Sequence, residues 1–289
     1  MELIKERKFV GERALFASRM LDIRDSVFED GESPLKESSA IRLEGCIFKW
    51  KYPLWYCDGV SAKGTTLLET ARSGIWYTKN ISMNDCTIDA PKTFRRSSNI
   101  LLRSVRMPRA QETLWHCKDV HMYDVSVSGD YFGMNCIGVD AERLYISGNY
   151  AFDGALNVIV KNSRLISKDA FWNCENVEVY DSLIIGEYLG WNSKNVKFVN
   201  CTIESNQGLC YMDGVTLVNC KLVNTDLAFE YSKVNAEVKS RIISVKNPTS
   251  GKITAYAIDE IIMEDGRVDT TLTTIVVGEG EADGAEGTE

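Results

Sequence analysis

The stretch Glu187–Ile203, EYLGWNSKNVKFVNCTI, is one copy of a unit that recurs along most of the chain. Moving from Val196 by 19 to 21 residues at a time, in either direction, reaches an aliphatic residue at every step. These anchor positions are Leu21, Ile41, Val60, Ile81, Ile100, Val120, Val139, Val158, Val177, Val196, Val215 and Val234. A fixed period of this length is typical of proteins that stack similar units into a solenoid.

Each unit repeats one internal pattern, which Val196 and its neighbours illustrate. Apolar residues follow the anchor at two and seven positions, here Phe198 and Ile203, and a spacing of two is β-strand periodicity. Asn, Gly or Asp precedes most anchors, here Asn195, and these residues tolerate the left-handed backbone of a sharp corner. The polar corners leave no room for the helical back of a leucine-rich repeat. The pattern therefore predicts an all-β, single-stranded parallel β-helix of about twelve coils, one for each anchor.

The unbroken register predicts a single domain over residues 1–277. Residues 1–14 are expected to cap the first coil, because an exposed strand edge is normally covered, and residues 15–239 hold the coils. The register fails after Val234, and residues 240–277 read as two strands around a Pro–Gly turn, which predicts a short antiparallel C-terminal cap. Residues 278–289 are acidic and nearly free of large apolar residues, so we expect them to be disordered.

The composition disfavours several classes of partner. A formal net charge of −8 argues against non-specific binding to nucleic acid or to an anionic membrane. No apolar run approaches the roughly 18 residues of a membrane span. The N-terminus, MELIKERKFVGERALF, lacks the apolar core and the cleavage site of a signal peptide, which predicts a cytoplasmic protein.

The cysteines fit a structural role. Eight of the nine fall in two repeat columns that also hold Ser, Thr and Ala, so we expect small, reduced core residues. No C-x-x-C pair is present, and the sequence predicts neither a metal site nor a cofactor.

The segments EYLGWNSKNVKFVNCTI, GLCYMDGVTLVNC, DLAFEYSKVNAEVKS and ISVKNPTSGKI together resemble an uncharacterised bacterial family, the domain-of-unknown-function family 3737. The resemblance covers nearly the whole chain except the acidic tail. It implies the architecture of the pectate-lyase-like β-helices, which are right-handed. It implies no activity and no catalytic residue, because the family brings none.

Candidate sites have to be sought down the columns, since equivalent residues of successive coils stack about 4.8 Å apart. One column holds five of the six tryptophans together with Arg95 and Asp153, so it is expected to be at least partly exposed. Sugar rings stack on flat aromatic rings, so this face predicts a carbohydrate groove. Alternatively, the tryptophans pack under a loop, in a dimer interface or as a stack within the core. The candidate ligand-binding residues are Trp55, Trp76, Arg95, Arg96, Trp115, Asn135, Trp172 and Trp191.

Catalysis would need an acid–base pair on this face, and the candidate pair is His116 with Asp153 or Glu112. Asp153 lies two coils beyond His116, so about 10 Å away along the axis, which is slightly wide for an inverting carboxylate pair. The Gly-His-Gly signature of β-helix hydrolases is absent, and aspartates do not cluster in neighbouring coils of one exposed column.

Two classes of function are therefore compatible with the sequence. The first is a non-catalytic scaffold or interaction protein with an exposed aromatic face, which a second copy of the chain or another partner would cover. The alternative is a carbohydrate-binding or carbohydrate-processing protein, similar to a glycoside hydrolase or lyase, with an oligosaccharide as its partner. The exposure of the tryptophans discriminates between them, because a groove needs them half-open beside converging polar groups and an interface needs a flat apolar patch.

Overall fold

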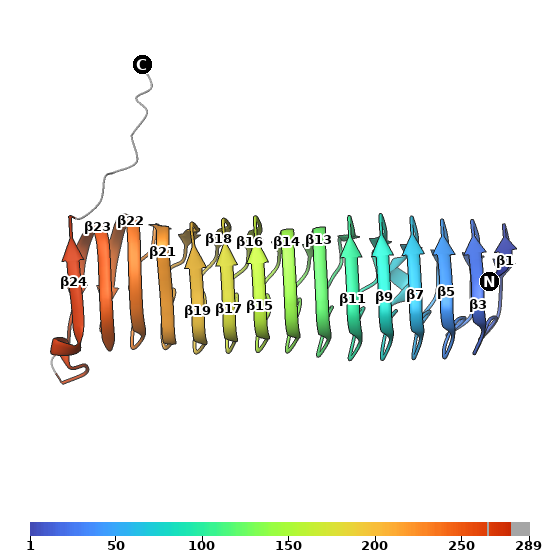
Figure 1. Cartoon of the computed structure of the whole chain (residues 1–289), viewed down its shortest axis with the longest axis horizontal. Helices are drawn as coiled ribbons and strands as arrows, with labels where there is room; N and C mark the ends of the chain where they lie inside the picture. The colour runs from blue at the N-terminus through green and yellow to red at the C-terminus, as the bar shows by residue number, and fades with distance from the viewer. Residues whose placement is uncertain (265, 279–289) are drawn as a thin grey trace, which may run out of the picture. The chain divides into compact units, whose positions relative to one another are not determined.

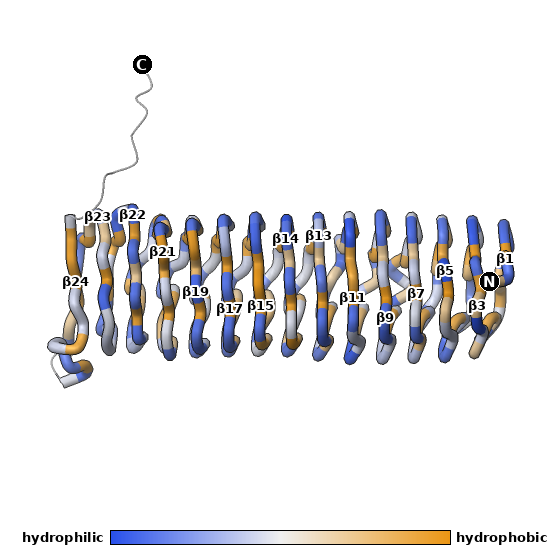
Figure 2. The backbone as a smooth tube through the Cα atoms, in the orientation of Figure 1, coloured by the Kyte–Doolittle hydropathy of each residue, from blue (hydrophilic) through white to orange (hydrophobic). Residues whose placement is uncertain are grey.

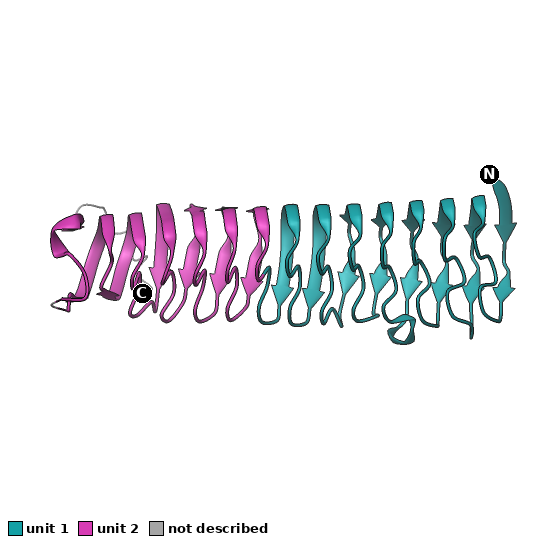
Figure 3. Ribbon diagram, turned by 90° about the horizontal axis from the view of Figure 1, so that it is seen from below, with its two compact units in different colours: residues 1–152 teal, residues 153–289 magenta. Residues whose placement is uncertain are grey.

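The computed structural model describes residues 1–264 and 266–278, and the chain divides into two compact units, Met1–Phe152 and Asp153–Glu289 (Figure 3). Each unit is a parallel β-solenoid, and together the described residues make about 14 turns. The predicted fold class is confirmed. Among the described residues no helix is long and apolar enough to cross a membrane. The single domain expected over residues 1–277 stays a prediction.

In unit 1 most turns consist of a longer strand and a short one joined by tight corners (Figure 1). Strands of successive turns pair in parallel, and the anchors lie opposite one another, Leu21 against Ile41 and Ile41 against Val60. A 3-10 helix, η1 (Glu69–Ala71), fills the longest repeat. The strands are β1 (Glu2–Lys5), β2 (Lys8–Phe9), β3 (Arg19–Arg24), β4 (Val27–Phe28), β5 (Ser39–Glu44), β6 (Ile47–Phe48), β7 (Asp58–Lys63), β8 (Thr66–Leu67), β9 (Lys79–Asn84), β10 (Thr87–Ile88), β11 (Ser98–Arg103), β12 (Arg106–Met107), β13 (Lys118–Ser128) and β14 (Ile137–Ser147).

Unit 2 repeats the arrangement, and Val177 lies opposite both Val158 and Val196 in the neighbouring turns. A second 3-10 helix, η2 (Thr270–Leu272), precedes the last strand. The strands are β15 (Leu156–Lys161), β16 (Arg164–Ile166), β17 (Glu175–Tyr180), β18 (Leu183–Ile185), β19 (Lys194–Val199), β20 (Thr202–Glu204), β21 (Asp213–Val223), β22 (Lys233–Lys246), β23 (Ser250–Ile262) and β24 (Thr273–Val277).

The two ends of the described chain differ from the sequence prediction. Residues 1–14 do not form a separate cap, because β1 pairs in parallel with β3 and β2 with β4, which adds a turn. At the other end β22, β23 and β24 also pair in parallel, so the antiparallel orientation expected for residues 240–277 is wrong. The Pro–Gly segment is a solenoid corner and not a hairpin. The acidic tail lies outside the described residues from position 279 on.

A bulge explains why the register fails after Val234. The pairing of β22 with β23 shifts between Val238 and Arg241. Against the preceding turn, β22 already has one residue fewer, because Leu217 lies opposite Ala236 but Cys220 lies opposite Val238. Arg241 is therefore exposed, with its Nε donating to Asp259 Oδ1 at 2.5 Å, and Ile242 is fully buried. The strand thereby bends and the chain continues around the solenoid.

The core is built from stacked columns of equivalent side chains. Figure 2 shows hydrophobic and hydrophilic stretches alternating along each turn. The rings of Phe9, Phe28 and Phe48 stack in order, with centroids 4.7 and 4.4 Å apart. The residues six positions before the anchors also face inward, and those of unit 1 from Leu35 to Phe152 are buried, as are those of unit 2 from Phe171 to Ala228.

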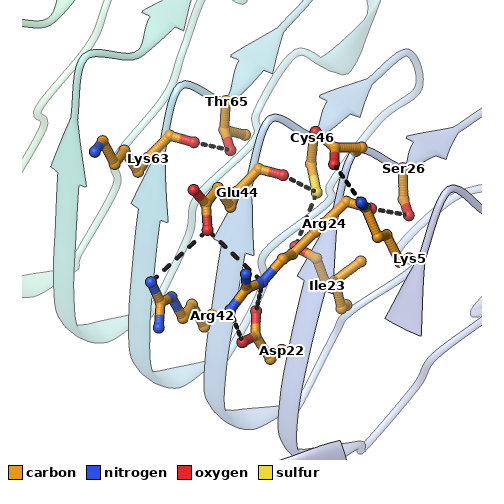
Figure 4. A network of polar contacts seen from close by, with 11 residues as sticks. Lys5, Asp22, Ile23, Arg24, Ser26, Arg42, Glu44, Cys46, Lys63 and Thr65 are labelled. Carbon is orange, nitrogen blue, oxygen red and sulfur yellow. Dashed lines mark hydrogen bonds and ion pairs between the residues drawn. The ribbon is translucent and has the colours of Figure 1, made fainter. Parts of the chain in front are cut away.

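Small polar side chains link the turns from inside. The hydroxyl of Thr78 and the thiol of Cys57 donate to main-chain carbonyls of the preceding turn, Leu54 O at 2.7 Å and Leu35 O at 3.1 Å. Figure 4 shows Cys46 in the same role, donating to Ile23 O at 3.3 Å. All nine cysteines are free and buried, which confirms their predicted role as reduced core residues. Burial raises the pKa of the Cys57 thiol to about 12.

Asparagine amides link the turns from outside. In unit 2, Asn195 Nδ2 donates to Asn176 Oδ1 at 2.7 Å, and Asn176 Nδ2 donates to Asn157 Oδ1 at 3.0 Å. All three residues have left-handed backbone and stand just before an anchor, as the corner prediction requires. We call this series the asparagine ladder.

An ion-pair network covers the outward face of β3 and β5 (Figure 4). Arg24 donates to both carboxylate oxygens of Asp22, from Nε at 3.1 Å and from Nη2 at 2.7 Å. Glu44 lies 3.7 Å from both Arg24 and Arg42. The hydrogen bond from Arg24 lowers the pKa of Asp22 below its usual range.

Candidate functional site

The predicted aromatic face of unit 1 exists as a stacked column on the corner surface. Parallel bridges place Trp76 beside Arg95 and Arg95 beside Trp115 in successive turns. Each lies five residues before its anchor, immediately after a buried residue of the core. We call Trp55, Trp76, Arg95 and Trp115 the aromatic column. All four side chains are half-buried, as the mixed composition of the column predicts.

The rings of the aromatic column face along the solenoid. Trp55 and Trp76 stack at a centroid distance of 5.0 Å and an interplanar angle of 7°. The guanidinium carbon of Arg95 lies 5.0 Å from the Trp76 ring and 4.3 Å from the Trp115 ring. Since Trp55 and Arg95 come from the turns before and after Trp76, both faces of that indole are covered. Such cation–π contacts contribute about 0.5–1 kcal/mol at exposed sites.

Hydrogen bonds fix the same rings to the following turn. The indole Nε1 of Trp55 donates to Ser73 O at 2.6 Å, that of Trp76 to Lys92 O at 2.8 Å, and that of Trp115 to Tyr131 O at 2.7 Å. Each accepting carbonyl belongs to a residue with left-handed backbone. The corner geometry therefore aims a carbonyl at each of these three indoles.

Glu112 belongs to this column through its ion pairs. Arg95 Nη2 donates to Glu112 Oε2 at 2.5 Å, and Lys92 Nζ lies 3.2 Å from the same oxygen. The carboxylate that the sequence offered as a catalytic acid or base thus accepts from two cations. It holds the Arg95 guanidinium in place between two indoles.

A second column runs beside the aromatic column, one residue further along each turn. Its rings also face along the solenoid, because Tyr56 and Tyr77 stack at 4.8 Å and 5° and Lys36 Nζ lies 5.6 Å from the other side of Tyr56. Arg96 and His116 continue the column and are exposed. The predicted ligand residue Asn135 follows in the next turn and is half-buried.

Two cations next to this second column were missed by the sequence analysis. Lys79 and Lys118 both lie opposite Ser98, on β9 and β13, so they are roughly 10 Å apart and both exposed. The signal was present, since each lysine stands two residues before an anchor. We call Lys79, Arg96, His116 and Lys118 the basic strip.

In unit 2 the predicted tryptophans are arranged differently. Trp172 and Trp191 meet edge to face, with centroids 6.4 Å apart and planes at 79°, and both are half-buried. Trp191 Nε1 donates to Gln207 O at 2.5 Å. Asp153 accepts a hydrogen bond from Asn173 Nδ2 at 3.2 Å.

The catalytic hypothesis gains no support from these positions. His116 and Asp153 belong to different units, so their pairing stays a prediction. The pairing of His116 with Glu112 also stays a prediction, since the Glu112 carboxylate contacts Arg95 and Lys92. Within the described ranges no group of three or more His, Cys, Asp or Glu residues could hold a metal ion.

Fold and site together define a parallel β-solenoid with a stacked aromatic column on its corner surface. The chain belongs to the family described as protein of unknown function DUF3737, which it matches over residues 2–276. This confirms the resemblance drawn from the repeat segments. No curated protein matches the chain as a relative.

Several solved structures are similar to this chain at low identity. PfbA, a surface adhesin of Streptococcus pneumoniae, is 10% identical over 76% of this chain and 71% of its own, with a TM-score of 0.38. The mannuronan C-5 epimerase AlgE4 A-module of Azotobacter vinelandii is 10% identical over 88% of each chain, with a TM-score of 0.30. Full-length QnrB1, a plasmid-mediated fluoroquinolone resistance protein, is 16% identical over 77% of this chain and 94% of its own, with a TM-score of 0.22. Likenesses this weak carry no argument about activity.

Proposed function

We propose that the protein is a non-catalytic interaction protein that binds another protein through the aromatic column of unit 1. The observation that supports this most is the fixed geometry of the column, in which Trp76 has both faces covered and its N–H bonded. Trp, Tyr and Arg are the residue types that dominate binding energy at protein interfaces. Side chains that are already immobilised lose little conformational entropy on binding, so this surface is preorganised.

Carbohydrate binding is the alternative, and the ring geometry favours it less. A sugar ring stacks on an open aromatic face. In unit 1 both faces of Trp76 are covered, as are both sides of Tyr56. Trp55 is contacted by Trp76 and by the tilted ring of Tyr52 at 4.5 Å, and Trp115 has one face covered by Arg95. What the column offers to solvent is mainly ring edges.

Site-specific photo-crosslinking tests the proposal. A photoreactive phenylalanine analogue replaces His116, where an aromatic residue fits because the equivalent residues of earlier turns are Tyr56 and Tyr77. The matched control carries the analogue in place of Lys63, which is exposed at the far end of β7, roughly 16 Å along the strand from Asp58. Illumination in extracts of the native host, where the prediction places the protein in the cytoplasm, should give a discrete cross-linked protein at His116 only.

Two outcomes would count against the proposal. Equal cross-linking at both positions would mean that the aromatic column has no special role. A saturable change of tryptophan fluorescence with an oligosaccharide, abolished by Trp115→Ala, would instead favour the carbohydrate alternative.

A further inference from the structure

We propose that the partner segment bound at the aromatic column is an acidic peptide, held by the basic strip. This inference rests on the proposed protein-binding function and specifies the chemistry of its partner. The distribution of charge in unit 1 differs from that of the chain as a whole.

The segment that carries half of the aromatic column and all of the basic strip has a surplus of positive charge. Residues 79–119 hold eight Lys or Arg against four Asp or Glu, whereas the whole chain has a formal net charge of −8. Three of these cations are already paired on the protein. Lys92 and Arg95 contact Glu112, and Arg109 donates to Asp89 at 2.9 and 2.7 Å.

The cations of the basic strip are placed differently. Lys79, Arg96 and Lys118 are exposed on three successive turns beside the rings. The carboxylate closest to Lys79 in the pairing register is Asp58, which accepts a hydrogen bond from Asn80 Nδ2 at 2.6 Å. Cations roughly 5 Å apart per turn, on long flexible side chains, can reach the carboxylates on one side of an extended chain, which are about 6.7 Å apart.

The aromatic rings beside the strip favour the same ligand. The edge of an aromatic ring carries partial positive charge and its face partial negative charge. Because stacking covers the faces, the edges are what a ligand meets, and edges attract carboxylates. Nucleobases and sugars rely on open ring faces for stacking, so a peptide rich in Asp or Glu fits this surface better than either of them.

The test is a fluorescence-anisotropy titration of the full chain with a labelled peptide of alternating glutamate and alanine. A peptide of alternating glutamine and alanine is the uncharged control. Saturable binding is expected for the acidic peptide only. Its affinity should fall at least about tenfold between about 0.1 M and about 1 M salt, because the Debye length shortens from about 10 Å to about 3 Å.

Paired variants locate the site. The double variant Arg96→Gln with Lys118→Gln should weaken binding about tenfold, since charges that face each other across an interface set both encounter and specificity. Lys63→Gln, which removes the same kind of charge away from the column, should leave binding unchanged. Thermal unfolding followed by far-UV CD verifies that the variants are folded, which is expected because the altered side chains are exposed.

Three results would overturn the inference. One is an absence of saturable peptide binding. Another is peptide binding that the double variant does not change. The third is binding of a sulphated oligosaccharide, weakened by the double variant, in place of the peptide. A cross-link at His116 without acidic-peptide binding would keep the proposed function and remove only this specification of the partner.

Discussion

Replacing Thr78 by valine should destabilise the protein more than its small change in shape suggests. Thr78 is fully buried, and its hydroxyl donates to Leu54 O at 2.7 Å while accepting from the Cys57 N–H at 3.2 Å. Valine has the same shape but leaves both main-chain groups without that partner in the core. Each buried polar group left unsatisfied costs about 1–3 kcal/mol. Two such groups cost about 2–6 kcal/mol, and the methyl group that valine buries offsets part of this, so the free energy of unfolding should fall by about 2–4 kcal/mol.

Thr78→Ser is the matched control, because serine keeps both hydrogen bonds and loses one methyl group, worth about 1 kcal/mol. Urea unfolding, followed by far-UV CD and by tryptophan fluorescence, measures both variants against the natural chain. With a slope of about 3 kcal/mol per molar urea, the valine variant should unfold at a midpoint lower by about 1 M.

The order of the two variants is the decisive result. If Thr78→Val unfolded at the same urea concentration as Thr78→Ser, or at a higher one, the hydroxyl and thiol columns would be passive space-fillers. The proposed hydrogen-bonding role of Cys57 and Cys46 would then lose its basis as well.

Three further predictions concern the backbone, the thiols and the response to acid. Gly186→Ala should lower the free energy of unfolding by more than about 3 kcal/mol, because the added Cβ would lie 2.0 Å from Ser167 O. Gly11→Ala is the control: its Cβ would have no atom within 4 Å, so in the same urea assay it should cost only about 1 kcal/mol. Burial raises the pKa of Cys174 and Cys210 to about 12, so iodoacetamide at about pH 8 should label neither thiol in the folded protein. In urea it should label all nine cysteines, and intact-mass measurement counts the labels in each case. Native labelling of Cys174 would contradict this account of the core. The hydrogen bond from Arg24 lowers the pKa of Asp22, so this ion pair stabilises the fold above the unfolded-state pKa of about 4 and loses its effect as the pH falls below that value. Asp22→Asn should therefore lose less Tm on acidification than the natural chain. Equal losses of Tm in the two proteins would refute the role of Arg24.

The sequence was sufficient to predict the register because inward positions are periodic. Val60, Ile81 and Ile100 lie opposite one another as the repeat requires. Burial of a side chain depends on its position in the turn, and a single sequence contains that information. The bulge near Arg241 was not predictable in the same way, since it depends on how the last turns close.

The orientation of the tryptophan rings could not be predicted from their positions alone. Trp76 faces along the solenoid because its N–H reaches the carbonyl of Lys92, a main-chain group that carries no sequence signal. Sequence analysis identified the residues of the aromatic column but not which part of each ring meets solvent. Lys79 and Lys118 were missed for a different reason, because the search for a site followed the aromatic positions.

The asparagine ladder has a consequence for how such proteins can change length in evolution. Each amide gives its N–H to the previous rung and leaves its oxygen for the next, so Asn157, Asn176 and Asn195 are interchangeable partners. If one complete repeat were removed or duplicated, the turns brought together would present equivalent asparagines, and the hydrogen bonds between those turns would form again. An insertion or deletion of a single residue would instead exchange inward and outward side chains from that point on. Relatives of this protein should therefore differ in length by whole repeats, with odd-length changes confined to outward loops such as the one that contains η1.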